Sequence, residues 1–227
     1  RAPARAAAIA NPTPASAAPT KRPQTVSGQA LPLGYSPGSA SRVITVTARS
    51  PGSTTGTLQA WTRVASGRWQ RYGGSVTAHL GADGIGSASE STSRTPAGSF
   101  TLTQAFGRYG DPGTSLPYFV TNPADYWISQ AGSTYNTHQR CSNCGYNNGS
   151  NERLYYVNPE YNYAVVIDYN TRNAPGGVRP GKGSAFFLHV TDGSATAGCV
   201  AISQSTLTSL MRWLTPSAHP RILIGVS

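Results

Sequence analysis

A histidine and a cysteine stand at opposite ends of a short, glycine-punctuated stretch near the end of the chain. These are His189 and Cys199, with Gly193 and Gly198 between them. The thiolate is the attacking form of a cysteine, and a free thiol with a pKa of about 8.5 is mostly protonated at neutral pH. A cysteine paired with a histidine therefore predicts a thiol active site.

The two residue types suggest a division of labour. His189 would take the thiol proton, stabilise the thiolate as imidazolium and later return a proton to a leaving amine. Gly198 has no side chain, so the backbone N–H groups of Gly198 and Cys199 can converge on a developing oxyanion. The alternative is a buried, inert cysteine and an unrelated histidine at a strand end, and residue types alone do not separate the two.

Three elements must position this pair. Residues 186–190 are apolar and β-prone, and residues 192–198 are small or turn-forming. Residues 203–214 have helical periodicity, with Leu207, Leu210, Met211 and Leu214 on one stripe and Pro216 just beyond. His189 should therefore end a strand, and Cys199 should lie on a loop ahead of a helix.

The rest of the body is a succession of short β-type runs with turn residues between them. They cover residues 42–49, 57–64, 76–80, 100–106, 154–157, 163–168, 185–190 and 221–226. No other convincing helix and no internal repeat is present. The fold class predicted is a mostly β domain with one main helix after the cysteine.

Composition divides the chain into two parts. Residues 1–40 are rich in Ala, Pro, Ser and Thr and contain no acidic residue, which predicts a flexible basic leader or propeptide. Residues 41–227 suffice for one catalytic domain. No stretch reaches the roughly 18 apolar residues of a membrane span. No signal peptide is recognisable, which favours an exported chain numbered from a processed start over a cytosolic protein.

The chain is strongly basic, with 18 Lys and Arg against 8 Asp and Glu and a net charge of +10. The first acidic residue is Asp83. Such an excess favours an anionic partner, which includes an acidic wall polymer, a membrane surface or nucleic acid. The positive residues are scattered and no nucleic-acid motif is present, which argues against nucleic acid. A basic surface that only keeps an exported protein soluble is the simpler alternative.

Cys141 and Cys144 form a C-x-x-C pair. With His138 nearby, the pair supplies at most three local zinc ligands where a closed structural site needs four. A thioredoxin-like redox site would need a βαβ context that the sequence lacks. A short disulfide or two unpaired thiols are the remaining interpretations, and the disulfide is favoured if the protein is secreted.

Aromatic residues crowd residues 122–163 among Asn, Gly and Ser. Rings with one polar edge beside amides suit a groove for a glycan or peptide, and the predicted substrate-binding residues are Tyr126, Trp127, Tyr135 and Tyr146. For each single ring the alternative is a strand-face position with its hydroxyl in water. Asp192 is the only acid expected near the His–Cys pair, where it would orient His189 or simply form a turn.

Two motifs carry a resemblance to a known family. The first is Leu188-His189 followed by SATAGCV over residues 194–200, and the second is RTPAGSF over residues 94–100. They resemble the Ser/Thr-x-Gly-Cys signature with its upstream histidine, and the Thr-Pro-x-Gly-x-Phe element, of the L,D-transpeptidase (YkuD-type) catalytic domain. The similarity covers about residues 40–227. It implies a β-sandwich-like fold with Cys199 as nucleophile and His189 as base.

The chain departs from the family pattern at three points. Ala197 stands where the family commonly has histidine, Ala201 stands where Asn or Arg is frequent, and the interval from His189 to Cys199 is shorter than usual. Because the family assigns the base to the upstream histidine, the change at Ala197 bears on substrate positioning. Thr196 matches the Ser/Thr of the motif, and its hydroxyl is expected to brace the loop or contact the substrate.

The resemblance implies an extracytoplasmic, cell-wall L,D-transpeptidase that needs no metal or organic cofactor. Cys199 would attack an L-centre carbonyl in a peptidoglycan tetrapeptide stem and expel the terminal D-alanine. The thioester would then pass to the side-chain amine of a neighbouring stem. The net charge, and not the resemblance, favours an anionic wall polymer as a second partner. Two alternatives remain, a hydrolytic L,D-carboxypeptidase or endopeptidase with the same site and a non-catalytic wall-binding module.

Overall fold

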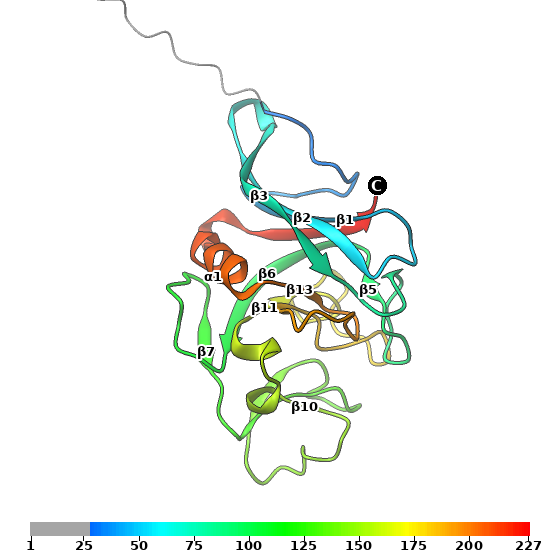
Figure 1. The fold of residues 1–227 in the computed structure, drawn as a ribbon. Coiled ribbons are helices and arrows are strands. Elements are labelled where there is room, and N and C mark those ends of the chain that lie inside the picture. Colours follow the sequence, from blue (N-terminus) through cyan, green and yellow to red (C-terminus); the bar gives the residue numbers. More distant parts are fainter. Residues whose placement is uncertain (1–27) are drawn as a thin grey trace, which may run out of the picture.

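Strands whose side chains alternate between two faces make up the main sheet of the computed structural model, which describes residues 28–227 (Figure 1). The strands are β1 (Arg42–Ala48), β2 (Thr55–Arg63), β3 (Trp69–His79), β6 (Gly98–Gly107), β7 (Tyr118–Val120), β11 (Ala164–Ile167), β12 (Phe187–Val190), β13 (Val200–Ile202) and β14 (Arg221–Val226). Their order is β11-β12-β13-β3-β2-β1-β14-β6-β7, and β6 also pairs with β11, so the sheet closes on itself.

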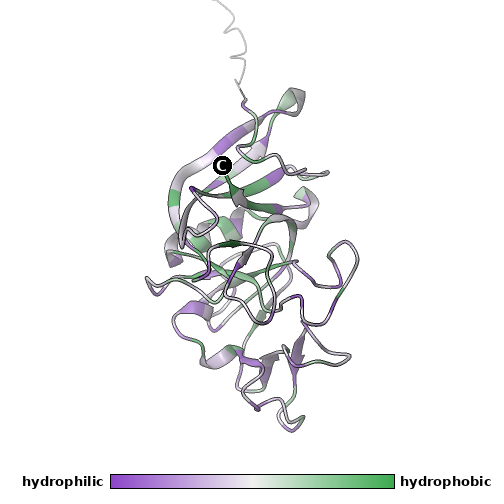
Figure 2. Ribbon diagram, turned by 90° about the vertical axis from the view of Figure 1, so that its right-hand side faces the viewer, coloured by the Kyte–Doolittle hydropathy of each residue, from purple (hydrophilic) through white to green (hydrophobic). Residues whose placement is uncertain are grey.

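The alternation along each strand produces an inner core and outer apolar faces. In β11, Val165 and Ile167 belong to the core that the closed sheet surrounds, whereas Ala164 and Val166 belong to a second cluster on the outer face. Both halves of the sheet contribute to the inner core, and the hydrophobic colour of Figure 2 concentrates in these strands and the helix. The predicted sandwich-like, mostly β fold is confirmed: residues 28–227 are 36% strand and 11% helical and contain one α-helix.

The helix α1 (Gln204–Trp213) follows β13 directly. The Ser203 side chain accepts a hydrogen bond from the Thr206 N–H and caps its first turn. Leu207, Leu210 and Met211 pack into the inner core, as their spacing predicted. The helix therefore anchors the strand that follows the cysteine.

Two smaller sheets and several single turns complete the fold. The three-stranded sheet has the order β10 (Glu152–Arg153), β8 (Asp125–Trp127), β9 (His138–Arg140), and the two-stranded one pairs β4 (Ile85–Gly86) with β5 (Thr95–Pro96). The 3-10 turns are η1 (Ala65–Gly67), η2 (Leu154–Tyr156), η3 (Glu160–Asn162) and η4 (Pro216–Ala218). The β8–β10 sheet and η2–η3 cover the outer face of β11 and β12.

The strand predicted over residues 154–157 is wrong, because η2 occupies this segment. Both edges of β11 are already taken by β6 and β12, so no sheet edge is open to a strand here. Leu154 is buried in the outer cluster, and Val157 packs against it. Tyr155 and Tyr156 instead lie under the guanidinium groups of Arg108 and Arg153, respectively.

The structure packs residues 28–40, the end of the predicted leader, against the domain. Gln29 exchanges two backbone hydrogen bonds with Trp69. Leu33 and Ala40 are buried with Trp61 and Trp69 in an apolar cluster on the outer face of β1 and β2. The remainder of the predicted leader, residues 1–27, lies outside the described residues. Within residues 28–227 no helix is long and apolar enough to cross a membrane.

Cys141 and Cys144 are joined by a disulfide, with their Cα atoms 5.8 Å apart. The short disulfide is therefore the interpretation of this pair that the structure supports. His138, the third candidate zinc ligand, instead bonds the Asp125 carboxylate through Nε2 at 2.7 Å. The disulfide closes the turn that follows β9.

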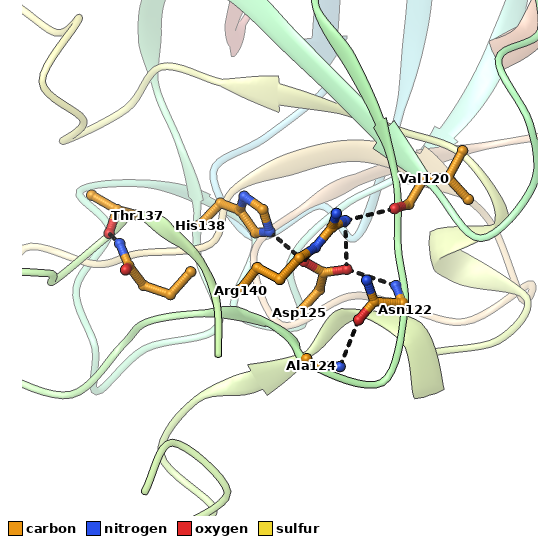
Figure 3. Close-up of polar contacts among 8 residues, drawn as sticks. Val120, Asn122, Ala124, Asp125, Thr137, His138 and Arg140 are labelled. Carbon is orange, nitrogen blue, oxygen red and sulfur yellow. Dashed lines mark hydrogen bonds and ion pairs between the residues drawn. The ribbon is translucent and has the colours of Figure 1, made fainter. Parts of the chain in front are cut away.

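A buried carboxylate joins β8 to β9 (Figure 3). Asp125 is 1% exposed and also accepts hydrogen bonds from Arg140 Nε at 2.7 Å and from the Asn122 N–H at 2.6 Å. Burial alone would raise the pKa of Asp125, but the hydrogen bonds from Arg140, Asn122 and His138 outweigh it and hold that pKa below its usual value of 3.8. Ionised Asp125 is thus a structural centre of the small sheet.

We expect Asp125→Asn to lower the free energy of unfolding at pH 7 by about 2 kcal/mol, because the buried hydrogen bonds lose a charged acceptor while exposed Arg140 regains water. A depressed carboxyl pKa stabilises the fold above the unfolded value and ceases to do so as pH falls through the folded one. In urea unfolding, the difference in free energy of unfolding between the wild type and the variant should therefore become smaller below pH 3.8. The control is Asp111→Asn, in an exposed turn; equal losses in both variants would contradict this role.

Candidate active site

The parallel pairing of β12 with β13 places His189 and Cys199 on one face. Leu188 pairs with Val200 and His189 with Ala201, so Cys199, one residue before β13, lies beside Phe187. Paired residues of a parallel ladder share a face, as do residues two apart on one strand. With a rise of about 3.3 Å per residue and strands about 4.8 Å apart, the two Cα atoms are diagonal neighbours about 8 Å apart.

This face is the outer one, and it is covered. Cys199 is 7% exposed and His189 6%. The cluster around the thiol consists of Phe106, Trp127, Leu154, Tyr161, Ala164, Val166, Ala185 and Phe187. The Tyr161 ring meets the His189 ring edge-on, with centroids 5.6 Å apart and planes at 77°. The pair therefore sits in low-dielectric surroundings.

Two backbone groups hold the thiol. The Phe187 N–H donates to Cys199 Sγ at 3.3 Å, and Sγ–H donates to the Ala185 carbonyl oxygen at 3.3 Å. Burial is the main cause that raises the pKa of the Cys199 thiol, and the charge of Glu152 raises it further. The hydrogen bond from the Phe187 N–H lowers this pKa by a smaller amount. Cys199 therefore rests as a neutral thiol whose sulfur is already oriented.

A backbone carbonyl sets the tautomer of His189. Its Nδ1 lies 2.7 Å from the Val190 carbonyl oxygen, which can only accept a hydrogen bond. Nδ1 therefore carries the proton, and Nε2 presents a lone pair. Burial lowers the pKa of His189, although the Val190 carbonyl and the charges of Glu160 and Asp192 oppose this. The imidazole is thus neutral at rest, as a base must be.

Asp192 stabilises the turn after β12, because its Oδ1 accepts a hydrogen bond from the Ser194 N–H at 2.8 Å. The orienting group for His189 is the Val190 carbonyl. The expectation that Asp192 is the only acid near the site is wrong. Glu152 lies near enough to Cys199 for its charge to raise the thiol pKa.

Threonines from two motifs brace the loop that carries Cys199. Thr196 Oγ1 accepts from the Gly198 N–H at 3.0 Å and donates to the Cys199 carbonyl oxygen at 2.7 Å. Thr95, of the RTPAGSF motif, donates to the same oxygen at 3.4 Å. The Thr196 N–H bonds the Leu80 carbonyl oxygen, which fastens the loop to the end of β3. Of the two backbone donors predicted for an oxyanion, Gly198 is thus already engaged, whereas the Cys199 N–H makes no hydrogen bond among residues 28–227.

Gly198 is required by both its backbone angle and its surroundings. Its φ is +131°, which L side chains rarely adopt. A Cβ there would lie 2.7 Å from Phe186 Cε1 and 2.9 Å from the Arg94 carbonyl oxygen. The close approach of the loop to Arg94 and Phe186 therefore depends on a missing side chain.

The four aromatic residues predicted for substrate binding are mostly packing residues. Tyr126, Trp127 and Tyr135 are only 6%, 3% and 3% exposed. The Trp127 ring packs on Phe187, with centroids 5.0 Å apart. Tyr146 is partly buried and lies tilted against Tyr126. Of the four rings, only Trp127 belongs to the cluster around the thiol.

A cavity of about 360 Å³ adjoins the loop. Ala197 and Phe186 line it on the side of the cysteine, and Glu90 and Glu152 line it elsewhere. Ala197 is where the family commonly has histidine, so its small side chain leaves this cavity open. The cavity gives a substrate a route to the loop.

The sequence did not indicate Glu152 as a residue of this site, and it indicated Tyr161 only as one of the aromatic residues in 122–163. Glu152 accepts a hydrogen bond from the Tyr161 hydroxyl. Glu152 comes from β10 and Tyr161 from η3, short elements without a periodic pattern. Only the docking of the small sheet onto β12 brings them to Cys199, so no local signal could have identified them.

We expect Gly198→Ala to lower the free energy of unfolding by about 2 kcal/mol or more and to change the accessibility of Cys199, because the new Cβ meets backbone atoms that cannot rotate away. Thermal unfolding and alkylation of Cys199 measure the two effects. Gly193→Ala is the matched control, since Gly193 also has a positive φ, +94°, with nothing within 4 Å. Similar losses of stability in the two variants would show that the positive φ alone, and not the contacts of the new Cβ, causes the loss.

Comparison with known proteins agrees with this geometry. No curated protein matches the chain. The model of one family, the L,D-transpeptidase catalytic domain, matches residues 48–223. That range includes both motifs, the closed sheet from the end of β1 and the His189–Cys199 pair. Because this match covers most of the chain, the chain belongs to the YkuD family of L,D-transpeptidase catalytic domains.

Proposed function

We propose that this protein is a cysteine acyltransferase that forms peptidoglycan peptide cross-links through a thioester on Cys199. The observation that carries the proposal is the shared outer face of β12 and β13, where Sγ is held by backbone groups and His189 presents Nε2. Membership of the L,D-transpeptidase family supports a stem peptide as the substrate.

The first half-reaction forms the thioester. Nε2 of His189 takes the Sγ proton as sulfur attacks the carbonyl carbon of the donor stem. The carbonyl oxygen becomes an oxyanion, for which the Cys199 N–H is the available donor. When the tetrahedral intermediate collapses, the C–N bond breaks and the leaving amine of D-alanine takes the proton from His189.

The second half-reaction transfers the acyl group. The acceptor amine attacks the thioester carbonyl carbon, its proton passes to Nε2, and the C–S bond breaks. The sulfur then recovers its proton from His189. Because both groups are neutral at rest, proton transfer accompanies attack, and no thiolate–imidazolium pair has to persist in the apolar site. No step calls for a metal or organic cofactor.

The compartment we propose is extracytoplasmic, either secreted or attached to the wall. The family match supports this, since its substrate is the wall. The Cys141–Cys144 disulfide also supports it, because such bonds persist in oxidising compartments.

Cys199→Ala should abolish turnover of a tetrapeptide stem and formation of a covalent adduct with a carbapenem-type β-lactam, because both need the sulfur. His189→Gln should slow both by about a hundredfold or more, since general-base catalysis contributes that much. Mass spectrometry locates the adduct. An adduct on another residue, or full activity in Cys199→Ala, would refute the mechanism.

Product analysis with and without an acceptor amine separates the proposed reaction from its alternatives. Cross-linked dimers that form only with the acceptor indicate transpeptidation. Release of D-alanine or cleavage in its absence, with no dimers in its presence, indicates a hydrolase. Binding to sacculi with an unchanged muropeptide profile would indicate the non-catalytic module.

The second partner we propose is an anionic wall polymer that binds the end of the molecule formed by β1–β3 and β14 (Figure 1). All eight acidic residues of the chain lie between Asp83 and Asp192. Residues 28–82 and 193–227 therefore carry only positive charges, at Arg42, Arg49, Arg63, Arg68, Arg71, Arg212 and Arg221. This separation of charge supports binding of the polymer away from the thiol.

We expect the double variant Arg49→Gln/Arg71→Gln to bind polyanion-bearing sacculi several-fold more weakly at low salt, with the difference disappearing at 1 M salt, where charges are screened over about 3 Å. Both side chains are exposed. A sedimentation assay measures binding. The control, Arg172→Gln/Lys182→Gln, removes the same charge from exposed positions beyond this end. Equal weakening in both variants would mean that net charge, and not this end, binds the polymer.

A further inference from the structure

Glu152 comes from a distant part of the chain and lies near the thiol, but it has no role in the acyl transfer described above. Glu152 accepts a hydrogen bond from the Tyr161 hydroxyl. Tyr161 in turn packs edge-on against His189 and lies in the same buried cluster as Cys199. Glu152 also lines the cavity that Phe186 and Ala197 border. One residue is thus connected to the base, the nucleophile and the route of the substrate.

Glu152 carries its charge without a cationic partner. Both ion pairs found within residues 28–227 belong to Asp125, so neither neutralises Glu152. The adjacent Arg153 turns its guanidinium over the Tyr156 ring, 4.0 Å from the centroid. The hydrogen bond from Tyr161 stabilises the carboxylate but does not cancel its charge. That charge therefore acts on nearby groups through a medium of low dielectric.

The titratable groups around Glu152 come from several elements. Tyr161 on η3, Glu90 in the loop after β4 and Cys199 ahead of β13 interact with Glu152 directly. Glu160 on η3 acts on Tyr161 and on His189, and His189 on β12 packs against Tyr161. Glu90 is itself hydrogen-bonded by the Tyr135 hydroxyl and is exposed. Ionised Cys199 would therefore place a second negative charge in the pocket that Glu152 adjoins.

We propose that Glu152 is a positioning residue of this site: it holds the Tyr161 ring against His189, and its negative charge favours the thiol form of Cys199 over the thiolate. Two like charges close to each other in a partly buried site destabilise each other. The nucleophile therefore stays protonated while Glu152 is ionised. The consequence for turnover rests on the acyl transfer proposed above, whereas the electrostatic effect on the thiol does not.

The pH at which this effect begins follows from the surroundings of Glu152. Burial first, with a smaller contribution from Glu90, raises the pKa of Glu152 to about 7, although the Tyr161 hydroxyl opposes the rise. Glu152 is thus neutral in weak acid and ionised in weak base. Its effect on Cys199 should appear only as pH rises through about 7. A merely structural role would act at every pH.

The test is the rate of Cys199 alkylation by iodoacetamide from pH 5.5 to pH 9, located by mass spectrometry, in the intact protein and Glu152→Gln. The amide keeps an acceptor for the Tyr161 hydroxyl but removes the charge. We expect the variant to react about as fast as the wild type at pH 5.5 and about tenfold faster at pH 9. The reason is that a nearby negative charge lowers the fraction of cysteine present as thiolate about tenfold. A ratio constant across this range, or below one at pH 9, would overturn the proposal.

Asp83→Asn is the matched control. It removes an exposed carboxylate that lines the same cavity but does not contribute to the shift of Cys199. Its alkylation profile should follow the wild type. A tenfold increase at pH 9 in this variant as well would show that the total charge of the cavity is responsible, and would overturn the assignment to Glu152.

The wild-type profile keeps the proposal testable even if Glu152→Gln does not fold. The alkylation rate should rise with pH, flatten near pH 7 as Glu152 ionises, and then rise again. In Tyr161→Phe the carboxylate loses its hydrogen bond, so the flattening should move to higher pH. A wild-type profile that follows a single titration would overturn the proposal. Because alkylation needs no wall substrate, this result is independent of whether the protein cross-links peptidoglycan.

Discussion

The parallel pairing of β12 with β13 is the constraint on which the site depends. A register of Leu188 with Val200 puts Phe187, His189 and Cys199 on the same face. A slip by one residue would turn Cys199 to the opposite face, among the aliphatic residues of the inner core. The alternation that buries Leu188 and Val190 inside the closed sheet thus also turns His189 outward. The packing that forms the inner core therefore also brings His189 and Cys199 together on the outer face.

A buried site imposes its own chemistry on this pair. Burial disfavours both the thiolate and the imidazolium, so the resting groups are neutral and oriented by backbone atoms of residues 185–190. Backbone donors and acceptors on a sheet are rigid, and they need no charged partner in the apolar cluster. In the acyl transfer proposed above, the thiol therefore loses its proton only as the sulfur attacks the substrate carbonyl carbon.

The loop before β13 shows how distant segments share this task. Thr95 and Thr196 donate to one carbonyl oxygen, that of Cys199, and Gly198 lets the loop approach Arg94 and Phe186. The two motifs on which the family resemblance rests are therefore parts of one hydrogen-bonded structure. Glu152 and Tyr161 reach the same place from the small sheet and η3, whose position is determined by the outer face of β11 and β12.

The local sequence pattern determined those features of the protein that depend on residues close together in the sequence. The weak alternation in residues 42–49, the apolar run of residues 221–226 and the stripe of Leu207, Leu210 and Met211 sufficed for these two strands, the helix and the mostly β class. The types and order of His189, Gly198 and Cys199 sufficed for the predicted chemistry. Tertiary structure alone decided which carbonyl orients His189, that residues 154–157 form a turn, that Trp127 and Tyr135 are buried, and that Glu152 faces the thiol. These outcomes depend on which sheet edges are occupied and which segments dock on an outer face, and such long-range contacts leave no period in the sequence.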